Sequence, residues 1–238
     1  MKTRRPAPPR RRKHEQYDYN VFINCPFDDK YKPLFHAMVF TIHHAGFIAR
    51  CALEASTQNY RFPRILDIIG ECRYGIHDVS RSVSGQEPRN NMPLELGVFI
   101  GCQYFGKSYD LEKEYLVLDT KAHEYKKYLT DLGGEDPSAH GDTVEGIISS
   151  VRDWLSMRIP TNEEPLPGAD YMGTLYQIFL DQKEDFCDRY RLRFEKLTFP
   201  EYVKVMTDFL EERHRDMDLV EESYKQIIEQ PEEAELDE

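Results

Sequence analysis

Between residues 17 and 156, segments typical of strands alternate with segments typical of helices, and this order limits the fold more than any other feature of the sequence. The strand-like segments are short, apolar and rich in β-branched or aromatic residues: Tyr17–Phe27, Phe47–Leu53, Tyr74–Ser80 and Glu114–Thr120. The helix-like segments place apolar residues at helical spacing: Tyr31–Gly46, Arg61–Arg73, the stretch after Asn91, and Asp142–Ser156. The alternation predicts an α/β fold, in which a parallel sheet is covered by helices on both faces.

Glycine and proline support several of these boundaries. Gly46 is expected just after the first helix, where glycine is common because it adopts positive φ at little cost. Pro63 falls in the first turn of the helix over Arg61–Arg73, where the missing N–H of proline costs nothing. Gly97 and Gly101 lie four residues apart in the next helix, and we expect them to let that helix approach the sheet closely.

The α/β pattern ends before the chain does. Residues 16–160 form the predicted α/β domain, and Pro160–Asp170 has the composition of a linker. Residues 165–228 are expected to form a C-terminal helical appendage, in which Thr198 and Glu201 have the spacing of a capping box. The appendage is the expected contact for a partner protein or for a second copy of the chain.

Charge is unevenly distributed along the chain. Residues 1–15 form a basic head containing prolines, residues 229–238 form an acidic tail, and both have the composition of disordered segments. The basic head could contact nucleic acid or another anionic surface, but a solvated tail is the simpler interpretation. The formal net charge of -12 argues against nucleic acid as a partner of the whole chain.

Several classes of protein are excluded by what the sequence lacks. No apolar run approaches the roughly 18 residues of a membrane span, and the N-terminus has no apolar signal core. The five widely spaced cysteines indicate reduced thiols and a cytoplasmic protein. Neither a dinucleotide-binding glycine fingerprint nor a P-loop occurs, and no metal site is expected.

Polar residues gather where predicted strands end, so a parallel sheet would bring them to one edge. Ligands of such sheets bind beyond the carboxyl ends of the strands. The loop after the first strand carries Asn24, Phe27 and Asp28; the third strand ends at Asp78 and is followed by Ser80; the next helix begins near Asn91 and carries Glu95. We expect Asp78 and Glu95 to face the same crevice.

Each of these residues also has a structural interpretation. If Pro93 is the first helical residue, Glu95 occupies the third position, where glutamate caps helices and suits the helix dipole. The sequence alone does not separate this role from catalysis. Asp78 could cap a turn. Cys25 is better explained as a small buried residue than as a nucleophile, because no partner histidine is identifiable.

The stretch from "YGIHDVS" through an Asn-Asn loop to "NNMPLELGVFIG" resembles the nucleoside 2-deoxyribosyltransferases and their bacterial TIR-like relatives. In those families a strand ends in Asp-x-Ser and the next helix opens around Glu-Leu-Gly, which here is Glu95-Leu96-Gly97. "VFINCPFDD" is similar to their first strand and ligand loop. The resemblance covers about residues 17–156. The Ser-x-Trp-Cys-x-x-Glu run of typical TIR domains is missing.

The resemblance implies a flavodoxin-like sheet and cleavage of an N-glycosidic bond in a nucleotide or nucleoside; if the nucleotide is NAD, it is a substrate rather than a cofactor. It assigns catalysis to Glu95 and ribose binding to Asp78, while Asn24, Phe27, Asp28, Ser80 and Asn91 line the substrate site. A carboxylate can attack the anomeric carbon or stabilise its positive charge. Nicotinamide leaves NAD as a neutral molecule and needs no general acid, which favours NAD over purine nucleosides.

Two alternatives stay open. The chain could be a non-catalytic module that senses a nucleotide or interacts with a partner, or it could be a nucleoside deoxyribosyltransferase. A role in bacterial stress or antiviral defence is implied by the resemblance alone.

Overall fold

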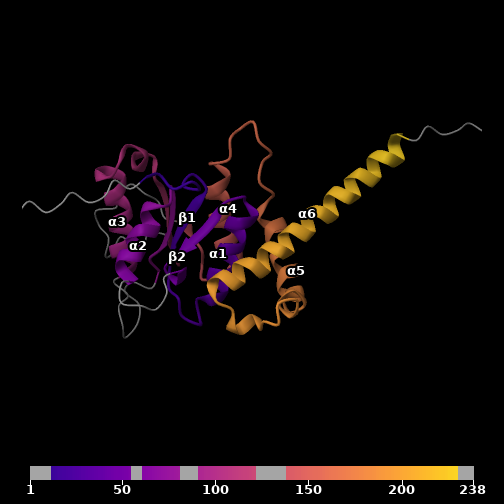
Figure 1. The fold of residues 1–238 in the computed structure, drawn as a ribbon, viewed down its shortest axis with the longest axis horizontal. Coiled ribbons are helices and arrows are strands. Elements are labelled where there is room, and N and C mark those ends of the chain that lie inside the picture. The colour runs from indigo at the N-terminus through magenta and orange to yellow at the C-terminus, as the bar shows by residue number, and fades with distance from the viewer. Residues whose placement is uncertain (1–11, 55–60, 81–90, 122–137, 230–238) are drawn as a thin grey trace, which may run out of the picture. The chain divides into compact units, whose positions relative to one another are not determined.

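The computed structural model describes residues 12–54, 61–80, 91–121 and 138–229, with side chains up to residue 215 (Figure 1). The chain divides into two compact units, Met1–Thr174 and Leu175–Glu238. The first unit contains the α/β domain, and the second contains most of the C-terminal helices. The boundary falls inside a helix, later in the chain than the predicted start of the appendage.

The first unit contains a five-stranded sheet in which all strands are parallel. Its strands are β1 (Asn20–Asn24), β2 (Ile48–Cys51), β3 (Tyr74–Asp78), β4 (Glu114–Asp119) and β5 (Ser138–Ala139), in the order β2-β1-β3-β4-β5. This is the flavodoxin-like order of a doubly wound α/β fold, as predicted. The sequence did not indicate β5, because a strand of two residues is too short to show a periodic pattern.

Helices cover both faces of the sheet. Figure 1 shows α2 (Arg61–Gly70) and α3 (Asn91–Phe105) on one side of the sheet and α1 (Lys32–His44) and α4 (Val144–Ser156) on the other. Short 3-10 turns, η1 (Ala52–Glu54) and η2 (Ser108–Glu112), follow β2 and α3. The helices start and end within a few residues of the predicted limits.

Local signals fix two helix ends, and the first of them, at Gly46, was predicted from the sequence. Gly46 has φ +80°, its N–H donates to His43 O, and the next N–H, of Phe47, donates to Ile42 O. These two bonds form the Schellman motif that ends α1. In α4, Thr143 caps the first turn by accepting a hydrogen bond from Gly146 N at 3.0 Å.

The two faces of the sheet have separate apolar layers. On the side of α2 and α3, Phe22 packs with Ile65, Ile68, Ile69 and Phe99. On the side of α4, Tyr74 contacts Phe47 and Trp154 edge to face, with ring centroids 5.4 Å and 5.9 Å apart. Burial on both faces explains why β1 and β3 are apolar throughout rather than alternating.

The expectation for Gly97 and Gly101 is wrong. A Cβ added at either glycine would have no atom within 4 Å, so neither residue brings α3 close to the sheet. The close approach occurs instead at Gly75 of β3, where an added Cβ would lie 2.9 Å from the Phe99 ring. A side chain at Gly75 would therefore clash with the rings of His77 and Phe99.

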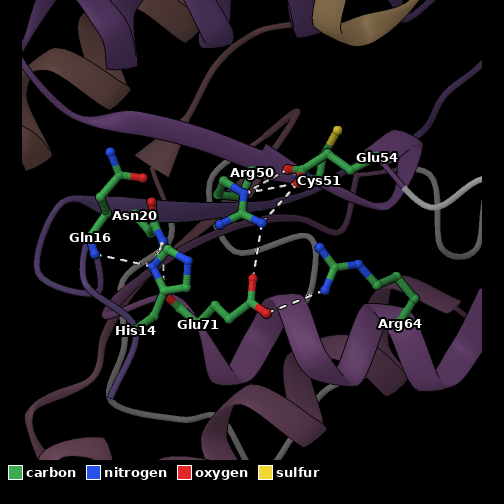
Figure 2. A network of polar contacts seen from close by, with 8 residues as sticks. All are labelled: His14, Gln16, Asn20, Arg50, Cys51, Glu54, Arg64 and Glu71. Atoms are coloured by element: carbon green, nitrogen blue, oxygen red, sulfur yellow. Dashed lines mark hydrogen bonds and ion pairs between the residues drawn. The ribbon is translucent and has the colours of Figure 1, made fainter. Parts of the chain in front are cut away.

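The structure describes the last residues of the basic head, 12–15, and two of them form polar contacts. Lys13 Nζ lies 2.6 Å from Asp18 Oδ2, and His14 Nδ1 accepts a hydrogen bond from Gln16 N. Figure 2 shows His14 and Asn20 beside Glu71, whose backbone oxygen accepts from Asn20 Nδ2 at 2.9 Å. Met1–Arg11 and residues 230–238 lie outside the described residues, so the predicted disorder of both ends stays a prediction.

The second unit is built around aromatic side chains. α5 (Ala169–Asp188) ends in this unit, and η5 (Phe194–Lys196) and α6 (Phe199–Glu229) follow. Phe179, Phe186, Phe194, Tyr202 and Phe209 form its buried cluster. At the start of α6, Thr198 N donates to Glu201 Oε2 at 2.8 Å, which is the glutamate half of the predicted capping box. Among the described residues, no helix has both the length and the apolar character of a membrane span.

Candidate functional site

The predicted site residues lie where the strand order reverses. From β1 the chain continues to β2 on one side, whereas β3, β4 and β5 extend on the other. The loops after β1 and β3 therefore diverge, and crevices at such switch points are the usual ligand sites of doubly wound sheets. Asn24 is the last residue of β1 and Asp78 the last of β3.

Asn24 ties three elements together at this point. Its Nδ2 lies 2.8 Å from Met92 O in the first turn of α3 and 3.0 Å from His77 Nδ1 in β3. Since Asn24 supplies the hydrogen, His77 Nδ1 acts as the acceptor, and burial lowers the pKa of His77 to about 3. Asn24 is itself buried, so it orients α3 against the two strands.

Asp78 is fully enclosed, with 0% of its surface exposed. Its Oδ1 accepts from Ser80 N at 2.8 Å, and its Oδ2 accepts from the hydroxyl of Tyr31 and lies 3.1 Å from His140 Nε2. Burial raises the pKa of Asp78, but His140, Ser80 and Tyr31 outweigh it, so the pKa lies below the ordinary value. Asp78 therefore does not line an open crevice as expected, because both of its oxygens are already engaged.

Two of these partners were not indicated by the sequence. Tyr31 precedes α1, and His140 follows β5; both are buried. His140 Nδ1 accepts from Asp142 N at 3.1 Å, which turns Nε2 toward Asp78. No local pattern marks either residue, because their common partner lies far away in the sequence.

The loop after β1 uses two predicted site residues for packing and capping. The ring of Phe27 contacts Phe35 edge to face at 5.3 Å. Asp28 accepts at Oδ1 from Tyr31 N at 3.0 Å, and its carbonyl oxygen accepts from Tyr31 N and Lys32 N, so it holds the turn that begins α1. Both side chains are partly exposed, which leaves room for an additional contact with a ligand.

The buried thiol of Cys25 is surrounded by several acidic residues whose charges affect its pKa. Burial raises the pKa of its thiol, and the negative charges of Asp78, Glu95 and Asp28 act in the same direction. The thiol is buried and held in its neutral form, which agrees with a small packing residue rather than a nucleophile. All five cysteines are free thiols.

Glu95 is the acidic residue of this edge for which the described residues provide no polar partner. It is only 8% exposed, and no hydrogen bond or ion pair joins it to any described residue. Burial raises the pKa of its carboxyl to about 7, against a smaller lowering by the charge of Arg61. A carboxylate in such a place attracts a cation strongly once water is displaced.

The capping interpretation of Glu95 does not agree with the helix. α3 begins at Asn91, two residues before Pro93, and no acidic residue lies in its first turn. Glu95 is the fifth residue of α3, too late to bond the free N–H groups of the helix start. Its side chain therefore requires an explanation other than capping.

Ser80 and Asn91 lie on either side of a gap in the described chain. Ser80 is partly buried, and its hydroxyl has no hydrogen-bond partner among the described residues. Asn91 is exposed at the start of α3. The residues between them, 81–90, lie outside the described part of the chain.

Comparisons with protein-family models, with curated proteins and with solved structures find no match for this chain. Within the described ranges, no group of three or more His, Cys, Asp and Glu side chains is arranged to hold a metal ion. The candidate site therefore rests on its own geometry.

Proposed function

We propose that the chain is a TIR-like N-glycosidase that cleaves the ribosyl–base bond of NAD or a related nucleotide. Glu95 carries the reaction as the carboxylate that faces the anomeric carbon. The observation that supports this role is a buried glutamate at the switch point of the sheet with no partner among the described residues. Burying a carboxylate without a partner costs free energy, and sites of catalysis are where proteins commonly accept that cost.

Cleavage of the ribosyl–base bond requires a negative charge beside the anomeric carbon. The bond between C1′ and the pyridinium nitrogen breaks, its electron pair stays on that nitrogen, and nicotinamide leaves neutral. Positive charge then develops on the sugar, where ionised Glu95 stabilises it or bonds to it. Water forms the new C1′–O bond and gives up a proton, so the products from NAD are nicotinamide, ADP-ribose and a proton.

Glu95→Gln tests this role. The amide has nearly the same shape but no negative charge, so release of nicotinamide from NAD should fall roughly a hundredfold or more. The measurement is base release by chromatography, at low and high protein concentration because assembly through residues 165–228 is part of the proposal. Glu145→Gln, in the first turn of α4, is the matched control and should keep full activity.

The pH dependence separates the glycosidase from a transferase acting on purine nucleosides. Because the pKa of Glu95 is raised to about 7, a reaction that needs the carboxylate should accelerate as pH rises from 6 to 8. A purine leaving group needs a proton donor, so protonated Glu95 would make that reaction slow down over the same range. Wild-type activity in Glu95→Gln would exclude both.

A nucleotide sensor is the second candidate, and the contacts of Asp78 favour it. If Asp78 binds ribose, as predicted, it must release Tyr31 or His140. Occupancy of the site would then be transmitted to α1 and to the segment after β5. Tight binding of NAD without any base release, at either protein concentration, would support the sensor.

A further inference from the structure

The amide group of Asn24 is used inside the fold, although the sequence resemblance places Asn24 in the substrate site. The residue is only 2% exposed. Its Nδ2 lies 2.8 Å from Met92 O and 3.0 Å from His77 Nδ1. A carbonyl oxygen can only accept, so the amide atom that faces Met92 is the nitrogen, and His77 Nδ1 accepts its second hydrogen. Both hydrogens of Nδ2 are therefore donated within the protein, and neither is left for a ligand.

The two acceptors come from different elements and converge on this one nitrogen. His77 is the partner of Asn24 in the register of β1 and β3, and Met92 lies in the first turn of α3. The ring of His77 is itself held in place, because it is buried beside Phe22 and Phe99, with ring centroids 5.9 Å and 5.2 Å away. A carboxylate in place of the amide would have no hydrogen to donate, and a serine hydroxyl would have only one. The arrangement therefore matches the two hydrogens of a short amide side chain.

The bond to Met92 acts on the turn of α3 that carries Glu95. Both residues lie on the buried face of the helix, one turn apart, so they move together. Met92 also belongs to an apolar cluster with Val79 and Val117. Apolar contacts are non-directional, whereas the hydrogen bond from Asn24 sets the distance between the backbone of this turn and the ends of β1 and β3. Loss of the amide at Asn24 should therefore displace Glu95.

We propose that Asn24 is a positioning residue for Glu95 and not a contact of the substrate. Its two hydrogen bonds hold the first turn of α3 so that the carboxyl group of Glu95 lies beside the anomeric carbon. The inference rests on the proposed function, because the place of Glu95 affects the rate only if Glu95 acts on the sugar. A misplacement of about 1 Å can lower a rate roughly a hundredfold, so a residue that never touches the substrate can control kcat.

The other end of β1 contains a matched control. Asn20 is 0% exposed, and its Nδ2 lies 2.9 Å from Glu71 O and 3.4 Å from His14 Nδ1 (Figure 2). Its amide thus makes the same kinds of contact, with one backbone oxygen and one histidine, but at the amino end of the strand. Asn20→Leu and Asn24→Leu should both destabilise the fold, and only Asn24→Leu should move Glu95.

Initial rates of nicotinamide release from NAD give the first test. In Asn24→Leu, kcat should fall roughly tenfold to a hundredfold, while KM stays within about twofold of the wild-type value. Asn20→Leu should keep both constants, and the melting temperature of each variant is measured alongside. A raised KM with an unchanged kcat in Asn24→Leu would show that Asn24 binds the substrate, and an equal loss of kcat in both variants would show a general effect of lost stability. Either result overturns the proposal.

The pKa of Glu95 gives a second test that needs no turnover. Unfolding free energies are measured across the pH range for wild type and for each asparagine variant, with and without Glu95→Gln. The difference within each pair isolates Glu95, because every other titratable group is common to both members. The folded pKa of Glu95 should be about 7 in wild type and in Asn20→Leu. It should fall toward 4.5 in Asn24→Leu, because a displaced carboxyl group reaches water.

The second test also keeps this inference apart from the proposed function. If wild-type protein releases no nicotinamide, the glycosidase fails, and the pKa of Glu95 decides the role of Asn24. A fall of this pKa in Asn24→Leu alone supports the positioning role, whereas an unchanged pKa in Asn24→Leu, or an equal fall in Asn20→Leu, overturns it. If Asn24→Leu does not fold, Asn24→Ser, which keeps one hydrogen to donate, is measured in its place and should show smaller changes in the same direction.

Discussion

Two charged side chains are buried at opposite edges of the sheet, and their surroundings differ. Lys113 directly precedes β4 at the amino edge and is 0% exposed. Its Nζ donates to Ile69 O at 2.8 Å and to Cys72 O, and it lies 3.5 Å from Asp110 Oδ1. Burial lowers the pKa of Lys113, but these partners hold the charge in place.

Glu95 is buried to a similar degree at the carboxyl edge but has no such partners among the described residues. A buried charge with partners on every side helps to hold the fold, because removing it leaves those partners unsatisfied. A buried charge without partners costs stability, because the charged group loses its contact with water. The comparison separates a buried charge that the fold satisfies from a buried carboxyl group that has no partner among the described residues.

Lys113→Met should have the largest effect on stability. Methionine is close to lysine in side-chain length but has no ammonium group, so two carbonyl oxygens and Asp110 lose their donor. The free energy of unfolding should fall by about 3–5 kcal/mol. Urea unfolding at neutral pH measures the loss. Exposed Lys30→Met should change stability by less than about 0.5 kcal/mol. A mild effect at Lys113 would remove the contrast between the two edges.

The stability of the protein should fall by about 3 kcal/mol between pH 4.5 and pH 7 because of Glu95. Its pKa rises from 4.5 to about 7 on folding, so the unfolded chain ionises first and is favoured as pH rises through this range. Above about pH 8 the penalty is constant, because the carboxyl group is then ionised in both states. Glu95→Gln lacks this group, so its unfolding free energy should exceed that of wild type increasingly from pH 5 to pH 8. Parallel pH curves would show that Glu95 finds a partner.

Asp78→Asn should cost about 2 kcal/mol at neutral pH, because the amide loses charge-assisted bonding to Tyr31 and His140. The folded pKa of Asp78 is lowered, so its contribution is present above the pKa of an unfolded carboxyl and is lost as pH falls through the folded value. Unfolding at pH 7 and at pH 3 should therefore give a smaller difference at pH 3. An unchanged stability at pH 7 would show that the contacts of Asp78 with Tyr31 and His140 do not stabilise the fold.

Features that depend on near neighbours were predictable from the sequence. The succession of the first four strands and their helices along the chain follows from apolar periodicity. Gly46 ends α1, and Glu201 accepts from Thr198 N; both features depend only on residues a few positions away in the sequence. These signals also predicted the edge at which Asn24, Asp78 and Glu95 gather, since carboxyl ends of parallel strands meet at one edge.

What surrounds each of those residues was decided by the tertiary structure. The sequence placed Asp78 and Glu95 together as open site residues, whereas Asp78 is closed by Tyr31 and His140. It assigned the close approach of α3 to Gly97 and Gly101, whereas Gly75 provides it. The physical reason is that burial and pairing depend on groups brought together from distant segments, and local periodicity contains no information on which groups those are.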